Sequence, residues 1–298
     1  MEFFPNYPAG TQTDPARWAR DKEAEGWQGI CASDHFWVGT TRYPHVFVAA
    51  TQMASATTQI QITTSFCNNL FRSPVEFAQA ALALQAASSG RFHAGLGAGW
   101  EEDELIATGA TYPDGPTRIG MYIEALTIVR ALLRTGQCAF AGEFYNVDIT
   151  GDRALAPVSG SPPPLVASVG GPRGIREATP LVDRVEIKAS ARATRVGHLD
   201  FEIMATVSED EVRTNAERVR SISESVPMGI FILTGAGTGP GVAGLKQNFG
   251  DSYLSRFVGE PEAVADALRG LGELGIDRIQ LTEMFPGSHS ALAPHLLS

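Results

Sequence analysis

The sequence predicts an α/β fold, a (β/α)8 TIM barrel in which eight parallel strands alternate with eight helices. Short apolar runs alternate with helical stretches along the whole chain. Runs such as residues 231–234 (FILT) and 278–281 (RIQL) suit parallel strands that are buried on both faces. The chain has 298 residues, and about 250 is a usual size for eight such units. The absence of an internal repeat of about 20 to 50 residues excludes a solenoid.

Each strand of this barrel is expected from one apolar run, and the runs span residues 2–4, 29–33, 60–66, 92–96, 165–169, 185–188, 228–234 and 278–282. The helices are expected at residues 15–25, 45–57, 74–87, 118–134, 174–182, 209–225, 261–274 and 290–297. Three of the helices also carry start signals. Ser73 precedes a proline, Ser208 precedes an acidic triplet, and Glu260 precedes a proline.

The connection between the fourth and fifth predicted strands, residues 97–164, is longer than one helix requires. It contains the predicted helix, an extended piece at residues 138–150 and a Pro/Gly/Ser-rich piece at residues 156–164. We interpret it as an insertion over one mouth of the barrel, so residues 1–298 are expected to form a single domain. An open, doubly wound sheet is the structural alternative, but its G-x-G-x-x-G fingerprint after the first strand is missing.

Composition narrows the class of partner. Lys and Arg total 23 and Asp and Glu total 33, which gives a formal net charge of −10. Such a chain is not expected to bind nucleic acid or an anionic membrane surface. Apolar runs stay below the roughly 18 residues that cross a bilayer, and the first ten residues lack the features of a signal peptide. We therefore expect a cytoplasmic protein whose partner is a small-molecule substrate.

Metal-binding patterns are also missing from the sequence. The three cysteines Cys31, Cys67 and Cys138 are far apart and give no C-x-x-C spacing. The six histidines form neither H-x-H nor H-E-x-x-H. No metal site is expected, and a metal-dependent hydrolase is disfavoured.

Polar residues and glycines gather where four of the predicted strands end. In a TIM barrel the reactive groups come from these carboxyl ends and from the loops that follow. The second strand runs into residues 32–36 (ASDHF), the third into 64–69 (TSFCNN), the fourth into 95–100 (GLGAGW) and the fifth into 168–171 (SVGG). The candidate site is therefore expected at this end of the barrel.

Residues at these strand ends suggest a catalytic role and a binding role. His35, directly after Asp34, offers a titratable imidazole that suits general acid–base work, although a structural histidine is the alternative interpretation. Glycines at 95, 97 and 99 and at 170 and 171 allow the backbone to approach a ligand and to cradle a phosphate with N–H groups. Tight turns are the alternative interpretation of the glycines.

Residues 33–36 (SDHF), 64–74 (TSFCNNLFRSP), 89–104 and 166–172 resemble the bacterial luciferase-like superfamily of TIM-barrel flavin enzymes. The resemblance continues through residues 136–145 and 257–281. Within the superfamily, SDHF and the F-R-x-P piece are most similar to the oxidoreductases that use coenzyme F420, a 5-deazaflavin.

The resemblance implies a role for individual residues. His35 is implied as the acid or base of hydride transfer, and Asp34 as support for the end of the second strand. Ser65 and Phe66 correspond to a bulge that often contains a non-prolyl cis peptide and contacts the middle ring of the deazaflavin. The residues implied to hold the cofactor phosphate are Gly97, Ala98, Gly99, Gly170 and Gly171.

One departure from the sugar-phosphate dehydrogenases of this superfamily affects the site. Trp100 stands where those enzymes have a proton-transferring glutamate, and Glu101, Glu102 and Glu104 follow it. We take Glu101 as the second catalytic candidate. Lys188 is offset from the lysine that would clamp a sugar phosphate, so a phosphorylated sugar is not the expected substrate. The expected substrate pocket consists of Trp37, Phe71, Trp100 and Lys188, with core packing as the alternative interpretation of its aromatic residues.

The leading functional hypothesis is an F420-dependent oxidoreductase that moves a hydride between the deazaflavin and an apolar or cyclic organic substrate. The first alternative is a monooxygenase of the same superfamily that uses reduced FMN. The second is a flavin carrier without catalytic activity, which a titratable His35 disfavours. The resemblance also implies a homodimer.

Overall fold

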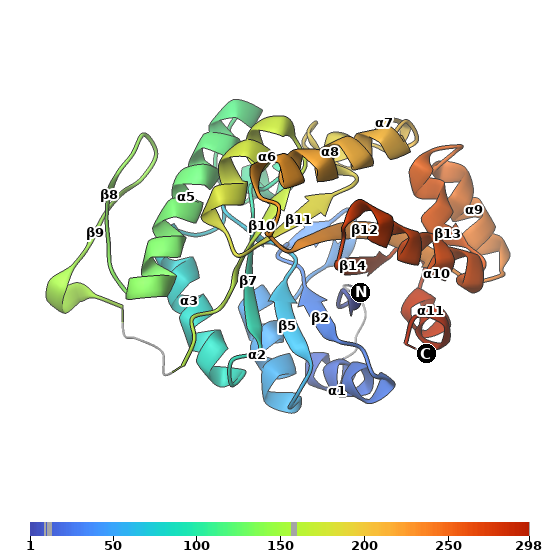
Figure 1. The fold of residues 1–298 in the computed structure, drawn as a ribbon, viewed down its shortest axis with the longest axis horizontal. Coiled ribbons are helices and arrows are strands. Elements are labelled where there is room, and N and C mark those ends of the chain that lie inside the picture. The colour runs from blue at the N-terminus through green and yellow to red at the C-terminus, as the bar shows by residue number, and fades with distance from the viewer. Residues whose placement is uncertain (9, 11–13, 156–159, 298) are drawn as a thin grey trace.

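The computed structural model describes residues 1–8, 10, 14–155 and 160–297. Its centre is a barrel of parallel strands surrounded by helices (Figure 1). The barrel strands are β1 (Glu2–Pro5), β2 (Gly29–Ala32), β5 (Gln61–Thr64), β7 (Phe92–Gly97), β10 (Leu165–Val169), β11 (Arg184–Lys188), β12 (Met228–Ala236) and β14 (Arg278–Glu283). Each arises from one predicted run, with ends shifted by at most two residues.

The order of these strands is β1-β14-β12-β11-β10-β7-β5-β2, and each pairing between them is parallel. A parallel bridge between Asn6 and Cys31 brings β1 beside β2 and completes the circle. There the N–H of Tyr7 donates to the Cys31 carbonyl at 2.8 Å. The predicted (β/α)8 barrel is confirmed.

The eight predicted helices are present as α1 (Pro15–Glu25), α2 (Val46–Ala56), α3 (Pro74–Ala87), α5 (Gly115–Thr135), α6 (Pro172–Ala178), α8 (Glu209–Ile222), α10 (Pro261–Gly270) and α11 (Ser288–Leu296). Ser73 and Ser208 cap their helices by accepting from the N–H groups of Glu76 and Glu211. The predicted helix over 174–182 is shorter, because Pro180 has no N–H to continue it and a 3-10 turn, Thr179–Leu181, follows.

Among the described residues, three further helices were not predicted: α4 (Glu102–Ala107), α7 (Phe201–Met204) and α9 (Pro240–Asn248). The first two are short, and α9 contains two glycines, which weaken a helical pattern. The remaining short strands are β3 (Trp37–Val38), β4 (Thr41–Arg42), β6 (Cys67–Asn68), β8 (Cys138–Ala141), β9 (Asn146–Ile149) and β13 (Val258–Gly259). Further 3-10 turns cover Gly151–Arg153, Ala191–Thr194, Tyr253–Phe257 and Leu271–Leu274.

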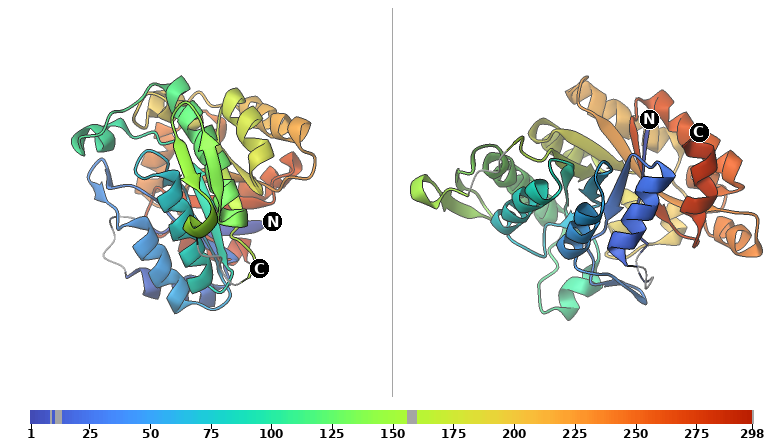
Figure 2. Two further views of the ribbon diagram at one scale, coloured as in Figure 1. Left: turned by 90° about the vertical axis from the view of Figure 1, so that its left-hand side faces the viewer. Right: turned by 90° about the horizontal axis from the view of Figure 1, so that it is seen from below.

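The expected insertion contains α4, α5 and an antiparallel hairpin of β8 and β9. In Figures 1 and 2 this hairpin projects beyond α5 and away from the barrel, so it does not cover a mouth. The turn of this hairpin, residues 142–145, packs on α5, where Glu124 accepts from the N–H of Tyr145, and the Tyr145 hydroxyl lies 3.2 Å from Asn69 Nδ2. Residues 156–159 of the Pro/Gly/Ser-rich piece lie outside the described residues.

The interior of the barrel is more polar than the run RIQL suggests. Arg278 is buried, and its guanidinium contacts Glu2, Gln61 and His93 from three other strands at 2.9 to 3.1 Å. The guanidinium also lies 4.1 Å from the centre of the Phe4 ring. A parallel strand can therefore carry charge inward where neighbouring strands supply partners.

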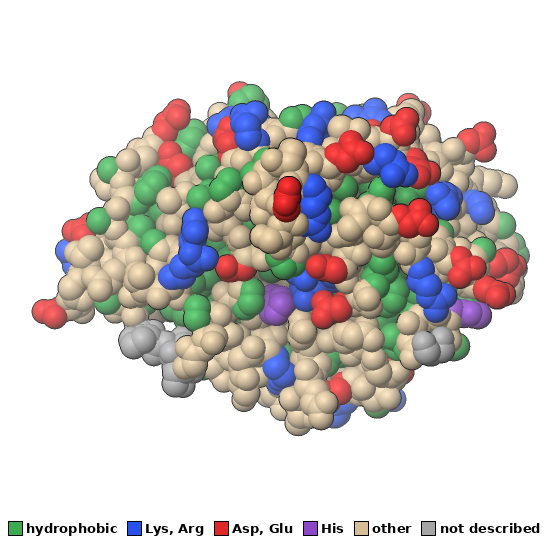
Figure 3. All heavy atoms as spheres, in the orientation of Figure 1, with side chains coloured by type: hydrophobic (Ala, Val, Ile, Leu, Met, Phe, Trp, Pro, Cys, Tyr) green, Lys and Arg blue, Asp and Glu red, His purple; other side chains and the backbone are tan. Residues whose placement is uncertain are grey.

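The outer surface shows acidic and basic side chains interspersed on the face drawn in Figure 3. Among the described residues, no helix is both long and apolar enough to pass through a bilayer.

Close packing inside the barrel generates a stability prediction at Gly29. A Cβ atom at this position would lie 2.2 Å from the Phe4 ring, so Gly29→Ala should lower the free energy of unfolding by about 1–3 kcal/mol. The matched control is Gly244→Ala in α9, where a Cβ meets nothing within 4 Å. This second change should be neutral or stabilising, since alanine favours a helix by up to about 1 kcal/mol. Urea unfolding of both variants would contradict the packing argument if the two midpoints moved together.

Candidate functional site

The four strand ends singled out in the sequence lie side by side. Strands β2, β5, β7 and β10 are consecutive in the barrel, and parallel strands finish at the same end. We call this end the C-terminal mouth. The loops after these strands carry Asp34, His35, Ser65 and the two glycine turns.

Asp34 does not pair with the neighbouring His35. Its carboxylate binds the Arg72 guanidinium through both oxygens, with Oδ1 accepting from Nη2 at 3.0 Å, and Oδ2 also accepts from the N–H of Asn68 at 2.8 Å. The side chains of Arg72 and Asp34 are only 7% and 6% exposed. This buried pair joins the loop after β2, which carries SDHF, to the segment after β6, which carries F-R-x-P.

His35 is oriented by Glu104, which lies on α4 and is fully buried. Its Nδ1 is 2.7 Å from Glu104 Oε2, and Glu104 Oε1 accepts from the N–H groups of Phe36 and Trp37. Because a carboxylate only accepts, Nδ1 carries the proton, which leaves Nε2 as the basic nitrogen of the neutral ring. The His35 ring packs 5.2 Å from Tyr43 and 5.5 Å from Trp100.

Lys188 reaches the same aromatic side chain from β11. Its Nζ lies 4.8 Å from the centre of the Trp100 ring and 3.2 Å from Thr194 Oγ1. Burial lowers the pKa of Lys188 to about 8, while the charge of Glu101 acts in the opposite direction. Trp100 therefore lies close to both a histidine and a lysine at the mouth.

Glu101 is buried beside this group, and among the described residues its carboxylate has no hydrogen-bond partner. Burial, followed by the charge of Glu104, raises its pKa. The structure thus brings together four predicted site residues, His35, Glu101, Trp100 and Lys188. Glu101 is thus a second titratable group near His35.

Trp37 and Phe71 belong to a separate aromatic group on the rim. Both pack against Phe36, with ring centres at 5.9 and 4.8 Å, and Phe36 is 45% exposed. The indole Nε1 of Trp37 donates to Asp103 at 3.0 Å. Their contacts are therefore with the rim rather than with the Trp100 group.

The peptide bond between Ser65 and Phe66 is cis, as the resemblance implied. Two glycines of β7 allow the segment that contains this bond to approach β7 closely. A Cβ at Gly95 would lie 1.9 Å from the Thr64 carbonyl oxygen, and one at Gly97 would lie 3.2 Å from Phe66 Cβ. Gly97 thus has a packing role inside the barrel.

The glycine turns leave backbone donors free at the mouth. Within the described part of the chain, no acceptor is found for the N–H groups of Ala98, Gly99, Gly170 and Gly171. The Arg195 guanidinium lies beside them and donates to the Gly170 carbonyl at 3.0 Å. Free N–H groups and a guanidinium on adjacent strand ends suit an anion such as phosphate.

Four contributors were not recognised in the sequence as partners of the site: Tyr43, Arg72, Glu104 and Arg195. Glu104 belongs to an acidic run that is also typical of the first turn of a helix. The sequence does not show that its side chain is buried, and this burial is what would have identified it. Arg72 lies within the F-R-x-P piece, but its carboxylate partner is 38 residues away. Such contacts between distant segments leave no local pattern.

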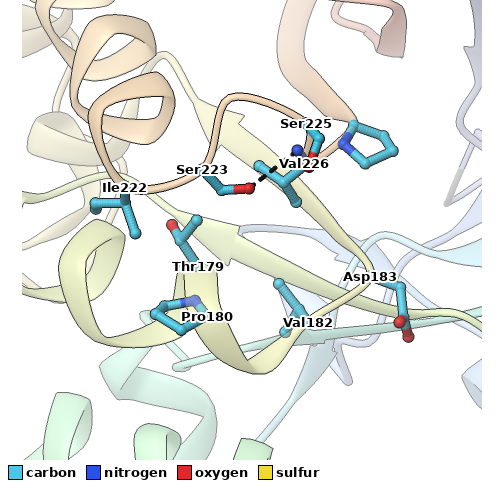
Figure 4. A pocket seen from close by; sticks show the side chains of 9 residues that line it. Thr179, Pro180, Val182, Asp183, Ile222, Ser223, Ser225 and Val226 are labelled. Atoms are coloured by element: carbon cyan, nitrogen blue, oxygen red, sulfur yellow. Dashed lines mark hydrogen bonds between the residues drawn. The ribbon is translucent and has the colours of Figure 1, made fainter.

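One hollow in the surface lies away from this site. A space of about 450 Å³ is lined by residues that precede β11 and β12, among them Thr179, Asp183 and Val226 (Figure 4). Strands begin at that end of the barrel, so this hollow is opposite the C-terminal mouth. It plays no part in the candidate site.

A family model described as luciferase-like monooxygenase matches residues 5–199. The chain is 30% identical over 162 residues to an F420-dependent glucose-6-phosphate dehydrogenase of Intrasporangium calvum, and 28% identical over 163 residues to one of Amycolatopsis mediterranei. These matches cover 52% and 53% of this chain but only 48% of each relative.

Two solved structures show the same fold over almost their whole length. An F420-dependent secondary alcohol dehydrogenase, in complex with an F420-acetone adduct, superposes with a TM-score of 0.73 at 19% identity and covers 99% of both chains. A monooxygenase from Streptomyces bottropensis gives a TM-score of 0.77 at 17% identity and covers 100% of this chain and 99% of its own.

The buried Asp34–Arg72 pair generates a stability prediction. Asp34→Asn leaves the guanidinium buried without a charged partner, so the free energy of unfolding should fall by about 3–5 kcal/mol. The control is Asp148→Asn, which breaks an exposed pair whose side chains are 68% and 61% accessible and should cost at most about 1 kcal/mol. Equal losses in chemical unfolding of the two variants would show that Asp34 is no more than a surface charge.

Proposed function

Because this chain belongs to the luciferase-like monooxygenase family, we propose that it is an oxidoreductase that uses the deazaflavin F420 to exchange a hydride with a small organic substrate. The observation that carries the proposal is His35, held by the buried Glu104 at the mouth where two glycine turns present free N–H groups. The choice of F420 is supported by the two curated relatives, whose names state that dependence.

The residues at the mouth fit such a cofactor. A phosphate would be held by the N–H groups of Ala98, Gly99, Gly170 and Gly171, with Arg195 beside them. Ser65 and Phe66, with Gly97 behind them, would lie against the ring system. When bound, F420 accepts or supplies the hydride at C5 of the deazaflavin.

Proton transfer would fall to His35. Removal of a hydride from an alcohol carbon requires loss of the hydroxyl proton, and Nε2 of the neutral imidazole is the basic atom available. Glu104 keeps the proton on Nδ1 and stabilises the imidazolium that forms. Glu101 is the second candidate for this proton, since its raised pKa brings it nearer to neutral pH.

The substrate would lie against Trp100, whose ring also lies beside Lys188. This surface suits an apolar or cyclic substrate with one oxygen near His35. Trp37 and Phe71, on the rim, would contact only a larger substrate.

A monooxygenase that uses reduced FMN is the second candidate. The description of the matching family favours it, and free N–H groups at the glycine turns would hold an FMN phosphate equally well. The identity of the bound flavin separates the two candidates.

We predict that the purified protein binds F420 more tightly than FMN, by about tenfold or more, which corresponds to about 1.4 kcal/mol. The reason is the likeness of SDHF and F-R-x-P to the F420 branch. Absorbance and fluorescence titration with oxidised and reduced forms of both flavins measures the two dissociation constants. Equal affinities, or tighter binding of FMN, would favour the monooxygenase.

We predict that His35→Ala lowers kcat by about 100- to 10,000-fold, the usual range for general acid–base catalysis, while F420 affinity stays nearly unchanged. The control is His45→Ala, which removes an exposed histidine that caps no N–H group of α2. Turnover at saturating F420 and the melting temperature are measured together. Lower stability with preserved turnover per bound cofactor would assign His35 a structural role, and Glu101→Gln would then be the variant to test.

A further inference from the structure

Buried polar atoms without partners gather inside the barrel. Among the described residues, the buried side-chain atoms that lack a hydrogen bond include both carboxylate oxygens of Glu186, Nε2 of Gln280 and Oδ1 of Asn6. These three residues lie on or directly after β11, β14 and β1 and are at most 2% exposed. Native proteins satisfy such atoms with water or by a change of protonation, because an unpaired buried group costs free energy.

Gly229 leaves the space that the carboxyl group of Glu186 occupies. A Cβ at Gly229 would lie 2.0 Å from Glu186 Oε2, so only glycine at that position of β12 admits the carboxyl group. The nearest cation, Arg278 Nη1, is 4.0 Å from Oε1, and its other nitrogens already serve Glu2 and Gln61. Burial raises the pKa of Glu186 to about 7, with Arg278 acting in the opposite direction. Both protonation states are therefore populated near neutral pH.

Gln280 connects this carboxyl group to the mouth. Its Oε1 accepts from the Ser65 hydroxyl, and its Nε2 faces Glu186 without reaching a direct hydrogen bond. From Ser65 the network continues to neighbouring strand ends, since Ser33 Oγ lies 3.3 Å from the Ser65 carbonyl and the buried Asn6 Nδ2 lies 2.9 Å from Ser33 Oγ. A polar chain thus runs from the interior to the residue expected beneath the cofactor.

The primary amide of Gln280 has one donating and one accepting end. An ionised Glu186 attracts Nε2, directly or through water, so Oε1 faces Ser65 and the Ser65 hydroxyl donates inward. A protonated Glu186 donates to Oε1, so the amide turns over and Nε2 donates to Ser65 Oγ. The Ser65 proton is then free to donate to another acceptor.

We propose that Glu186 is a positioning residue whose protonation state sets, through the Gln280 amide, whether the Ser65 hydroxyl donates into the barrel or toward the cofactor. The inference rests on the proposed function, because that function places F420 against Ser65. The titratable and charged groups around Glu186 come from several elements: Arg184 on β11, Asp277 and Arg278 at β14, Cys31 on β2, His93 on β7 and Glu2 on β1.

The first test measures F420 affinity between about pH 5.5 and about pH 8.5, on either side of the Glu186 pKa of about 7. Glu186→Gln imitates the protonated acid at every pH. The ratio of the wild-type dissociation constant to that of Glu186→Gln cancels the titration of the cofactor itself. This ratio should rise about three- to tenfold with pH, the value of one hydrogen bond. A constant ratio would overturn the proposal.

Two further variants make this test specific. When both proteins of this ratio also carry Ser65→Ala, the ratio should stay constant with pH, because the hydroxyl that responds to the amide is gone. Glu2→Gln is the control: it removes a carboxylate from the same Arg278 network without touching Gln280, and the rise should remain even if its midpoint moves. If Glu2→Gln by itself abolishes the rise of this ratio with pH, the effect is a general electrostatic one, and the relay is contradicted.

The second test needs no cofactor. An acid whose pKa is raised on folding stabilises the fold at low pH and loses that contribution as the pH rises through the folded-state value. The melting temperature of the wild type should therefore fall relative to Glu186→Gln between about pH 5 and about pH 8. The infrared carboxyl band that Glu186→Gln removes should titrate over the same range, and Ser65→Ala should shift its midpoint.

The two tests distinguish the failures. If F420 does not bind at any pH, the proposed function is rejected, and the infrared titration alone decides the relay. An unchanged midpoint in Ser65→Ala overturns the coupling between Glu186 and Ser65. A shifted midpoint with a constant affinity ratio overturns its connection to the cofactor.

Discussion

Closure of the parallel barrel is the constraint on which the rest of the molecule depends. Once β1 pairs with β14 and meets β2 through Asn6 and Cys31, every barrel strand finishes at one mouth. Loops that start more than 130 residues apart, after β2 and β10, then face one ligand-sized region. Closure also makes an interior in which polar side chains must find partners on other strands, since bulk water does not reach them.

Three buried carboxylates differ in the partners that they find. Asp34 is matched by the Arg72 guanidinium and a backbone N–H group. Glu104 accepts from one imidazole and two backbone N–H groups, so it organises the loop that carries His35. Glu186 has an arginine only at 4.0 Å and a raised pKa of about 7. The first two carboxylates fix the positions of the groups that they bind, whereas the protonation state of Glu186 responds to pH.

The sequence predicted the alternation of strands and helices well, because hydrophobic period and helix caps are local properties. It missed α9, whose glycines weaken the helical pattern, and although RIQL is the buried parallel strand that was predicted, the sequence did not show that its Arg278 and Gln280 find polar partners inside the barrel. It also placed the whole insertion over a mouth, although the β8–β9 hairpin projects outward. These errors arise where packing against distant strands outweighs local preference.

For the site, the sequence alone determined which residue types stand at the strand ends: the histidine of SDHF, the carboxylates after Trp100 and the glycines of two turns. Their positions follow from the strand pattern and from the rule that parallel strands finish together. Only the tertiary structure decided the pairings, Asp34 with Arg72, His35 with Glu104 and Trp100 with Lys188. Each joins segments separated by dozens of residues, and no local pattern records which side chains barrel closure brings into contact.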